Sequence, residues 1–172
     1  RGVLPSSTGV LYNGGDFSAF YKTIDQNPAS GWQGRPLRLL YFGRLISDKG
    51  AHTALEALAL LQQNGVADQV ELTVLGSGRD DYMTHLQRFA DENRIDHLIH
   101  FHQGVPREEV PAWLHRHDIY LFTSTWAEPL ARSVMEAMMA GMLVLGTEVG
   151  GQKEMLFNGE NCLLYTSDAA DD

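Results

Sequence analysis

The sequence has few of the features that mark secreted, membrane-spanning or nucleic-acid-binding proteins. A single cysteine, Cys162, excludes an internal disulfide framework and favours a reducing compartment. No apolar run approaches the roughly twenty residues that a membrane-spanning helix needs. Only 13 lysines and arginines stand against 22 aspartates and glutamates, and this net charge of −9 argues against a nucleic-acid surface, which must be basic. We therefore expect a cytoplasmic protein, and we leave open whether the full-length protein is membrane-peripheral.

The chain also lacks a recognisable beginning and end. It starts at Arg1 without an initiator Met or a signal pattern, and residues 166–172 close no element. Its 172 residues, 44% of them hydrophobic, suit one globular domain with its own core. We therefore expect residues 1–172 to be a single domain excised from a longer protein.

Apolar runs alternate with helical periodicities along most of the chain. The apolar runs predict strands at 37–42, 70–75, 99–101, 119–122, 143–145 and 162–165. The periodicities predict helices at 51–61, 83–90, 106–115 and 129–140. Such alternation implies right-handed crossovers and a parallel sheet that is covered on both faces. The predicted fold class is α/β, a doubly wound, Rossmann-like parallel sheet, in which ligands bind at the carboxyl ends of the strands.

The loop after the first predicted strand places two cations at such a carboxyl end. It reads Gly43-Arg44-Leu45-Ile46-Ser47-Asp48-Lys49-Gly50. A planar guanidinium and a point-charge ammonium that converge there would suit a diphosphate. The alternative is structural: Ser47 or Asp48 caps the following helix, and both cations are solvated.

A second polar segment follows the predicted strand at 119–122. Pro129 suits the first position of a helix, where its missing N–H would have no partner in any case. The N–H groups of Leu130, Ala131 and Arg132 would then be free at the helix start, which is an anion-binding arrangement.

Arg132 is an informative residue of this helix. A cation in the first turn opposes the helix dipole, and Arg132 before Glu136 is the weaker order for an i,i+4 pair. A bound anion would explain the placement; the alternative is a surface ion pair worth at most about 0.5 kcal/mol. We expect Glu136 to lie off the face that packs on the sheet, which carries Ala131, Val134, Met135 and Met138.

Three segments together resemble the family-four (group 1) retaining glycosyltransferases of GT-B fold. They are the 43–50 loop, the stretch from Glu128 to Met138 with seven residues between its two glutamates, and Gly150-Gly151-Gln152-Lys153-Glu154. The opening Asn13-Gly14-Gly15-Asp16, followed by Phe20, is similar to the start of that family's second domain. The resemblance covers nearly the whole chain and implies the C-terminal, nucleotide-sugar-binding domain, with the N-terminal acceptor domain absent.

The resemblance implies catalytic roles for three residues. Arg44 and Lys49, which follow Gly43, would hold the donor diphosphate and stabilise the leaving group. Glu128 would accept hydrogen bonds from hydroxyls of the donor sugar. The family commonly works without a bound metal, because fixed cations and helix N–H groups can neutralise the charge that a metal otherwise would. We therefore expect no metal and no cofactor.

The resemblance also implies a set of nucleotide-binding residues. The amides of Leu130 and Ala131, beside Arg132, would cap a phosphate, and Glu136 would hold the ribose diol. Gln103 to Val105, after the third strand, would lie near the base. The donor would be a nucleotide-diphosphate sugar such as a UDP- or GDP-hexose, and the hexosyl group would pass to an acceptor hydroxyl with retention.

Two positions depart from the family pattern. Leu130-Ala131 stands where the family usually has Phe-Gly, and a Cβ at Ala131 would crowd the donor if the backbone needs φ > 0 there. Cys162 stands where the family often has Gly.

Two other functions remain open at this stage. A non-catalytic nucleotide-binding or regulatory α/β module predicts that Arg44, Lys49 and Glu136 do not converge in space. A sugar-nucleotide epimerase or phosphorylase of GT-B fold would need a cofactor-binding lysine or a base histidine, and neither is evident.

Three further patterns carry less weight. Gly76-Ser77-Gly78 invites a dinucleotide-binding interpretation, but Asp81 replaces the third glycine, and we predict a structural turn. His100-x-His102 and His115-x-His117 lack a third ligand for zinc. Trp126 could stack on a sugar or be a partly buried loop aromatic.

Overall fold

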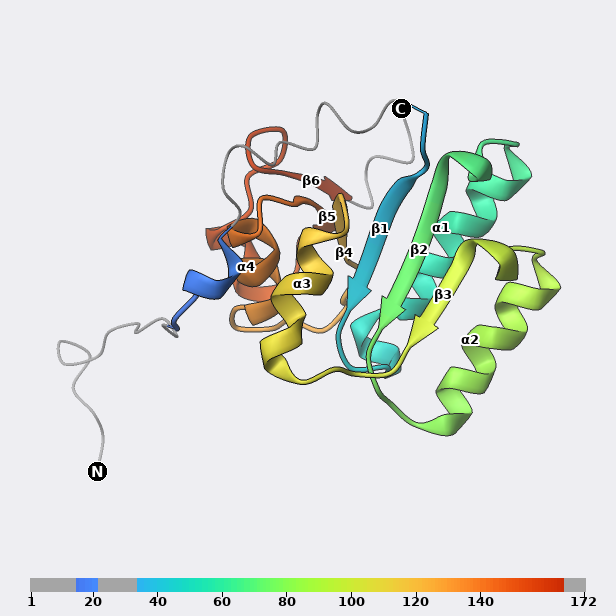
Figure 1. Ribbon diagram of the computed structural model, residues 1–172, viewed down its shortest axis with the longest axis horizontal. Coiled ribbons are helices and arrows are strands. Elements are labelled where there is room, and N and C mark those ends of the chain that lie inside the picture. The colour runs from blue at the N-terminus through green and yellow to red at the C-terminus, as the bar shows by residue number, and fades with distance from the viewer. Residues whose placement is uncertain (1–14, 22–33, 166–172) are drawn as a thin grey trace, which may run out of the picture.

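The computed structural model describes residues 15–21 and 34–165 (Figure 1). Asn13 and Gly14 of the opening motif lie outside the described residues. The strands are β1 (Leu37–Phe42), β2 (Val70–Leu75), β3 (Ile99–His102), β4 (Ile119–Phe122), β5 (Leu143–Thr147) and β6 (Cys162–Tyr165). The α-helices are α1 (Ala51–Gln63), α2 (Asp80–Glu92), α3 (Val110–His115) and α4 (Arg132–Met139).

The six strands form one parallel sheet in the order β3-β2-β1-β4-β5-β6. β1 pairs with β2 on one side and with β4 on the other, so the chain reverses its direction of winding between β1 and β4. In doubly wound sheets this switch point opens a crevice at the carboxyl ends of the two strands. The predicted α/β class is confirmed, and the site is expected beyond Phe42 and Phe122.

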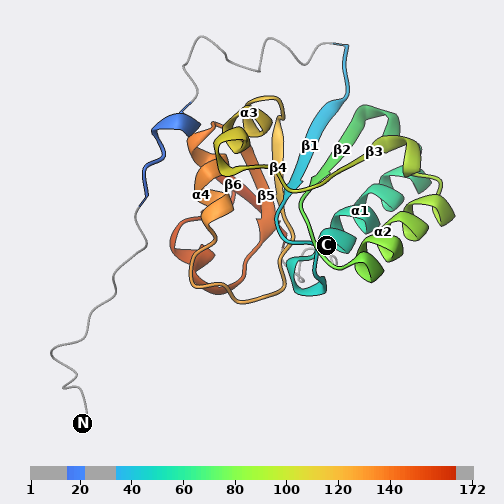
Figure 2. The same cartoon turned by 60° about the horizontal axis from the view of Figure 1, so that its bottom comes forward.

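Alternate residues of each central strand serve two separate cores. On β1, Leu39 and Tyr41 pack with α1 and α2, whereas Leu40 and Phe42 pack with α3 and α4. This alternation follows from the two-residue period of a strand and accounts for the nearly continuous apolar run. Figure 2 shows α1 and α2 on one face of the sheet and α3 and α4 on the other.

The helix predicted at 106–115 is divided into a short 3-10 turn, η8 (Arg107–Glu109), and α3. Pro111 explains the division. It has no N–H to donate to the carbonyl of Arg107, and the Val110 N–H closes a tighter turn on that carbonyl instead. Arg107 therefore occupies a short turn directly after the β3 loop.

His117 is a buried residue whose charge state should govern stability below neutral pH. Its ring nitrogens lie 2.7 Å from the Trp113 carbonyl oxygen and 2.9 Å from the Thr73 hydroxyl. Burial lowers the pKa of His117 below its ordinary 6.5. Below its ordinary pKa, His117 is therefore protonated in the unfolded chain and neutral in the folded chain. The free energy of unfolding should fall as pH drops below about 6.5, by up to about 1.4 kcal/mol per pH unit.

Urea unfolding between pH 7 and pH 5 measures this slope. We expect His117→Gln to flatten it, and His97→Gln, at an exposed position of the same residue type, to leave it unchanged. An equal slope in the wild type and His117→Gln would contradict the assignment.

Candidate functional site

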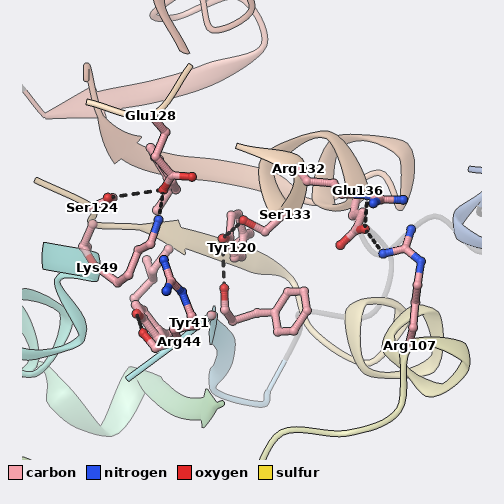
Figure 3. Close-up of a pocket in the computed structure, with 15 residues that line it drawn as sticks. Tyr41, Arg44, Lys49, Arg107, Tyr120, Ser124, Glu128, Arg132, Ser133 and Glu136 are labelled. Carbon is pink, nitrogen blue, oxygen red and sulfur yellow. Dashed lines mark hydrogen bonds and ion pairs between the residues drawn. The ribbon is translucent and has the colours of Figure 1, made fainter. Parts of the chain in front are cut away.

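A cavity of about 290 Å³ opens at the carboxyl ends of β1 and β4, at the switch point of the sheet (Figure 3). We name it the switch-point cavity. Its lining comes from the ends of β1 and β4, the loops that follow them, the start of α4 and η8. The residues are Tyr41, Phe42, Gly43, Arg44, Lys49, Arg107, Tyr120, Leu121, Phe122, Thr123, Ser124, Glu128, Arg132, Ser133 and Glu136.

The basic loop is tied to the end of β4 by its backbone. The Asp48 carbonyl oxygen accepts hydrogen bonds from the Thr125 N–H at 3.0 Å and the Ser124 hydroxyl at 3.1 Å. Gly50 has φ 73°, and a Cβ there would lie 1.8 Å from the Thr123 carbonyl oxygen, so only glycine fits. Gly50 is also the N-cap of α1, where no side chain caps the helix. The structural alternative, in which Ser47 or Asp48 caps that helix, is wrong.

The two cations of the loop differ in their partners. Lys49 forms an ion pair with Glu128, and the two side chains are 17% and 20% exposed. Arg44 has no acidic partner among residues 15–21 and 34–165. Its carbonyl oxygen accepts the Tyr41 hydroxyl at 3.0 Å, which fixes the backbone of the loop. The loop thus brings one paired and one unpaired cation to the same cavity.

Helix α4 begins at Arg132, three residues later than predicted. Ala131 is its N-cap with φ −76° and ψ 116°, and Pro129 and Leu130 precede the helix. The turn at Gly150 and Gly151 explains the delay. A Cβ on Gly151 would lie 1.6 Å from the Pro129 carbonyl oxygen, so the turn packs directly against this segment.

The late start of α4 changes which backbone N–H groups are available to an anion. The N–H groups of the first turn are those of Arg132, Ser133 and Val134. Of the three expected from a start at Pro129, Arg132 is retained, whereas Leu130 and Ala131 lie before the helix. Ala131 is 2% exposed and, like Leu130, does not line the cavity. Its negative φ also removes the expected crowding, because no positive-φ backbone is required at this position.

Glu136 is buried, contrary to the expectation that it lies off the packed face of the helix. Its side chain is only 3% exposed, and its Oε1 accepts a hydrogen bond from Arg107 Nη1 at 2.8 Å. Arg132 Nε lies 3.6 Å from the same oxygen. The predicted i,i+4 contact therefore exists, but it is secondary to a partner from η8. Val134, Glu136 and Ala137 are the buried residues of α4.

Two tyrosines support the floor of the cavity. The Tyr120 hydroxyl donates to Ser133 Oγ at 2.8 Å and lies 3.2 Å from the Phe42 carbonyl oxygen. Burial raises the pKa of both Tyr41 and Tyr120 well above the ordinary value of 10.0. Both hydroxyls therefore stay protonated at neutral pH and act as neutral donors that hold the lining in place.

Some predicted residues reach the cavity and others do not. Gly43, Arg44, Lys49, Glu128, Arg132 and Glu136 line it. Gln103 is exposed, and Val105 packs against the core under α3 and α4. Trp126 is 57% exposed and lies outside the lining. The residue of the β3 loop that does reach the cavity is Arg107, which the strand-end rule that selected Arg44 could also have selected.

The cavity is cationic in an acidic protein. Four positively charged side chains line it against two carboxylates, while the whole chain carries a net charge of −9. Each carboxylate already has a cationic partner in Lys49 or Arg107. The remaining positive charge and the N–H groups at the start of α4 suit an anionic group such as a diphosphate.

The glycines of the 76–78 turn have a packing role. A Cβ on Gly76 would lie 1.8 Å from the Gly43 carbonyl oxygen, and one on Gly78 would lie 2.0 Å from that of Leu45. The turn therefore packs against the basic loop, as expected of a structural turn. In the described part of the chain, no group of three or more His, Cys, Asp or Glu side chains could hold a metal ion.

The sequence profile of the family described as glycosyl transferases group 1 matches residues 23–172. The chain belongs to this family. Glycogen synthase of Mycobacterium tuberculosis is 31% identical over 152 residues, which are 88% of this chain and 34% of that protein. The chain spans less than half the length of the curated relatives it matches.

Solved structures show the same fold. Anabaena HepE, in complex with UDP and glucose, superposes with a TM-score of 0.79 at 26% identity over 96% of this chain and 45% of that one. The C-terminal domain of the group 1 protein LpcC from Francisella tularensis has a TM-score of 0.71 at 25% identity, over 88% of this chain and 80% of that domain. The predicted Rossmann-like half of a GT-B glycosyltransferase is confirmed. No described helix is both long and apolar enough to cross a membrane.

Proposed function

We propose that this chain is the donor-binding, C-terminal half of a retaining glycosyltransferase. It binds a nucleotide-diphosphate hexose, such as a UDP- or GDP-hexose, and needs neither a metal nor another cofactor. A separate N-terminal domain carries the acceptor, whose hydroxyl oxygen receives the hexosyl group. The binding of UDP and glucose by the similar HepE supports the ligand class.

One observation carries this proposal: both cations of the basic loop and both glutamates line the switch-point cavity. When the bond between the anomeric carbon and the diphosphate breaks, negative charge accumulates on the leaving group. Arg44, Lys49 and the first N–H groups of α4 are fixed donors for that charge. Glu128 accepts hydrogen bonds from the hydroxyls of the donor sugar, and Glu136 accepts them from the ribose hydroxyls.

The two alternatives receive less support. A non-catalytic module predicted that Arg44, Lys49 and Glu136 do not converge, whereas all three line one cavity. An epimerase or phosphorylase would need a base histidine or a cofactor-binding lysine. No histidine is among the lining residues of this described cavity, and Lys49 is paired with Glu128.

Calorimetry of the purified chain with UDP, GDP and ADP tests the proposal. We expect saturable binding of at least one of them, a loss of about tenfold or more in Arg44→Ala, and no sugar transfer by this chain alone. Arg94→Ala, at an exposed arginine distant in sequence from the cavity loops, is the control. Absence of binding heat with all three nucleotides, on protein shown to be folded, would contradict the proposal.

A further inference from the structure

Arg107 contacts the cavity from a part of the chain distant in sequence from both glutamates. It is the first residue of η8, between β3 and α3, and its Nη1 donates to Glu136 Oε1 at 2.8 Å. The Arg107 side chain is 50% exposed, whereas that of Glu136 is 3% exposed. The half-exposed Arg107 guanidinium thus lies between the buried Glu136 carboxylate and solvent.

The two oxygens of the Glu136 carboxylate have different surroundings. Arg107 and Arg132 both contact Oε1, and no donor among the described residues has a recorded contact with Oε2. Figure 3 shows both guanidinium groups approaching one oxygen, while the other oxygen points towards the cavity. One oxygen is therefore anchored, and the second remains an acceptor for a ligand hydroxyl.

Arg107 is the stronger of the two anchors. The Arg132 contact, at 3.6 Å, is too long for a hydrogen bond, whereas the Arg107 contact has the length of a charge-assisted one. A buried carboxylate without such a partner is strongly destabilising. Without Arg107, the Glu136 side chain would turn towards Arg132 or towards solvent, and its acceptor oxygen would leave its place.

Phe20 holds Arg107 in turn. The guanidinium carbon lies 5.6 Å from the centre of the Phe20 ring, within the range of a cation–π contact. Phe20 is 3% exposed and belongs to the core that includes Val134 and Ala137 of α4. Figures 1 and 2 show its turn, η2 (Ser18–Phe20), beside α4. The ring is therefore a fixed platform for the arginine.

We propose that Arg107, held over Phe20, is a positioning residue that fixes Glu136 so that its second oxygen faces the ribose hydroxyls of a nucleoside diphosphate. The inference rests on the proposed function, because it assumes that the cavity holds such a nucleotide. It adds a specificity device: discrimination between ribose and 2′-deoxyribose depends on a residue that itself touches neither sugar.

Calorimetry with two ligands tests this inference: the nucleoside diphosphate that binds the wild type best, and its 2′-deoxy analogue. We expect Arg107→Ala to weaken binding of the ribose form about tenfold and of the deoxy form less than about threefold. The two affinities define a ratio of ribose-form to deoxy-form binding. Arg107→Lys should recover part of the wild-type value of this ratio. Phe20→Leu, which removes the ring but keeps apolar volume, should shift the ratio in the same direction and by less.

Arg88→Ala is the matched control, because Arg88 is 68% exposed on α2 and pairs with Glu92 of the same helix. It should keep the wild-type ratio. Melting temperatures report whether each variant is folded. If Arg107→Ala does not fold, the affinity ratio of Arg107→Lys is the test. An unchanged ratio in a folded Arg107 variant overturns the inference and leaves the proposed function standing. Equal weakening of both ligands also overturns it, because Arg107 would then act on the phosphates. A wild type that binds no nucleotide overturns both.

Discussion

Replacing Glu136 with glutamine should weaken nucleoside diphosphate binding about tenfold to a hundredfold while changing the melting temperature little. The amide would keep its oxygen towards Arg107 and Arg132 and present an N–H₂ group to the cavity. A donor would then face the ribose hydroxyls where an acceptor is required. Stability should be nearly unaffected, because removal of a buried charge lowers the desolvation cost and both arginines are at least half exposed.

Calorimetry and thermal unfolding of the same samples measure the two effects separately. Glu92→Gln is a suitable control, since Glu92 is 66% exposed and also pairs with an arginine in i,i+4 order. A large fall in melting temperature with unchanged affinity would show instead that Glu136 serves only the fold.

Replacing Lys49 with glutamine should weaken nucleoside diphosphate binding about a hundredfold and leave nucleoside binding nearly unchanged. Two effects add in this variant. The diphosphate loses a cation, and Glu128 loses its ion-pair partner and becomes an unpaired negative charge in the cavity. The loss should therefore exceed that of Arg44→Gln, because Arg44 has no acidic partner in the described part of the chain.

A double-mutant cycle separates the two effects. Lys49→Gln combined with Glu128→Gln should bind the diphosphate better than Lys49→Gln alone, because the repulsion is removed. Lys153→Gln, at a 59% exposed lysine that also pairs with a glutamate, controls for the change of charge. If the nucleoside itself lost affinity to the same degree, Lys49 would be supporting the cavity rather than binding phosphate.

Much of the fold could be predicted because its signals are local. Strands β1, β2, β4 and β6 have the predicted bounds, and β3 and β5 run one and two residues further. Buried parallel strands are continuous apolar runs, and their ends are marked by residues that cannot continue them. The basic loop followed from the same reasoning, because parallel strands bring the loops after their carboxyl ends to one edge. Glu128 followed from the resemblance to the family.

The start of α4 could not be predicted in this way. Pro129 is a suitable first helical residue, and nothing nearby in the sequence contradicts that interpretation. The helix starts later because Gly150 and Gly151, twenty residues further along, pack against the segment. Helix boundaries that are set by such long-range packing have no local signal.

The burial of Glu136 was missed for a related reason. A helical wheel places it away from the apolar face, and its charge-assisted hydrogen bond is made by a residue of another element. Arg107 comes from the connection between β3 and α3, and Phe20 comes from the segment before β1. In sequence, Arg107 stands between a proline and two glutamates and looks like an ordinary charged helix start.

The close packing of Gly50 against Thr123 has a consequence for the thermodynamics of binding. Backbone contacts join the basic loop to the end of β4, so Lys49 and Glu128 are presented on one pre-organised frame. Little loop freedom remains to be lost when a donor arrives, and the entropy of ordering subtracts correspondingly little from the affinity. A site of this kind recognises its ligand by a fixed spacing of charges, and the spacing is set by main-chain atoms that substitution of most side chains leaves untouched.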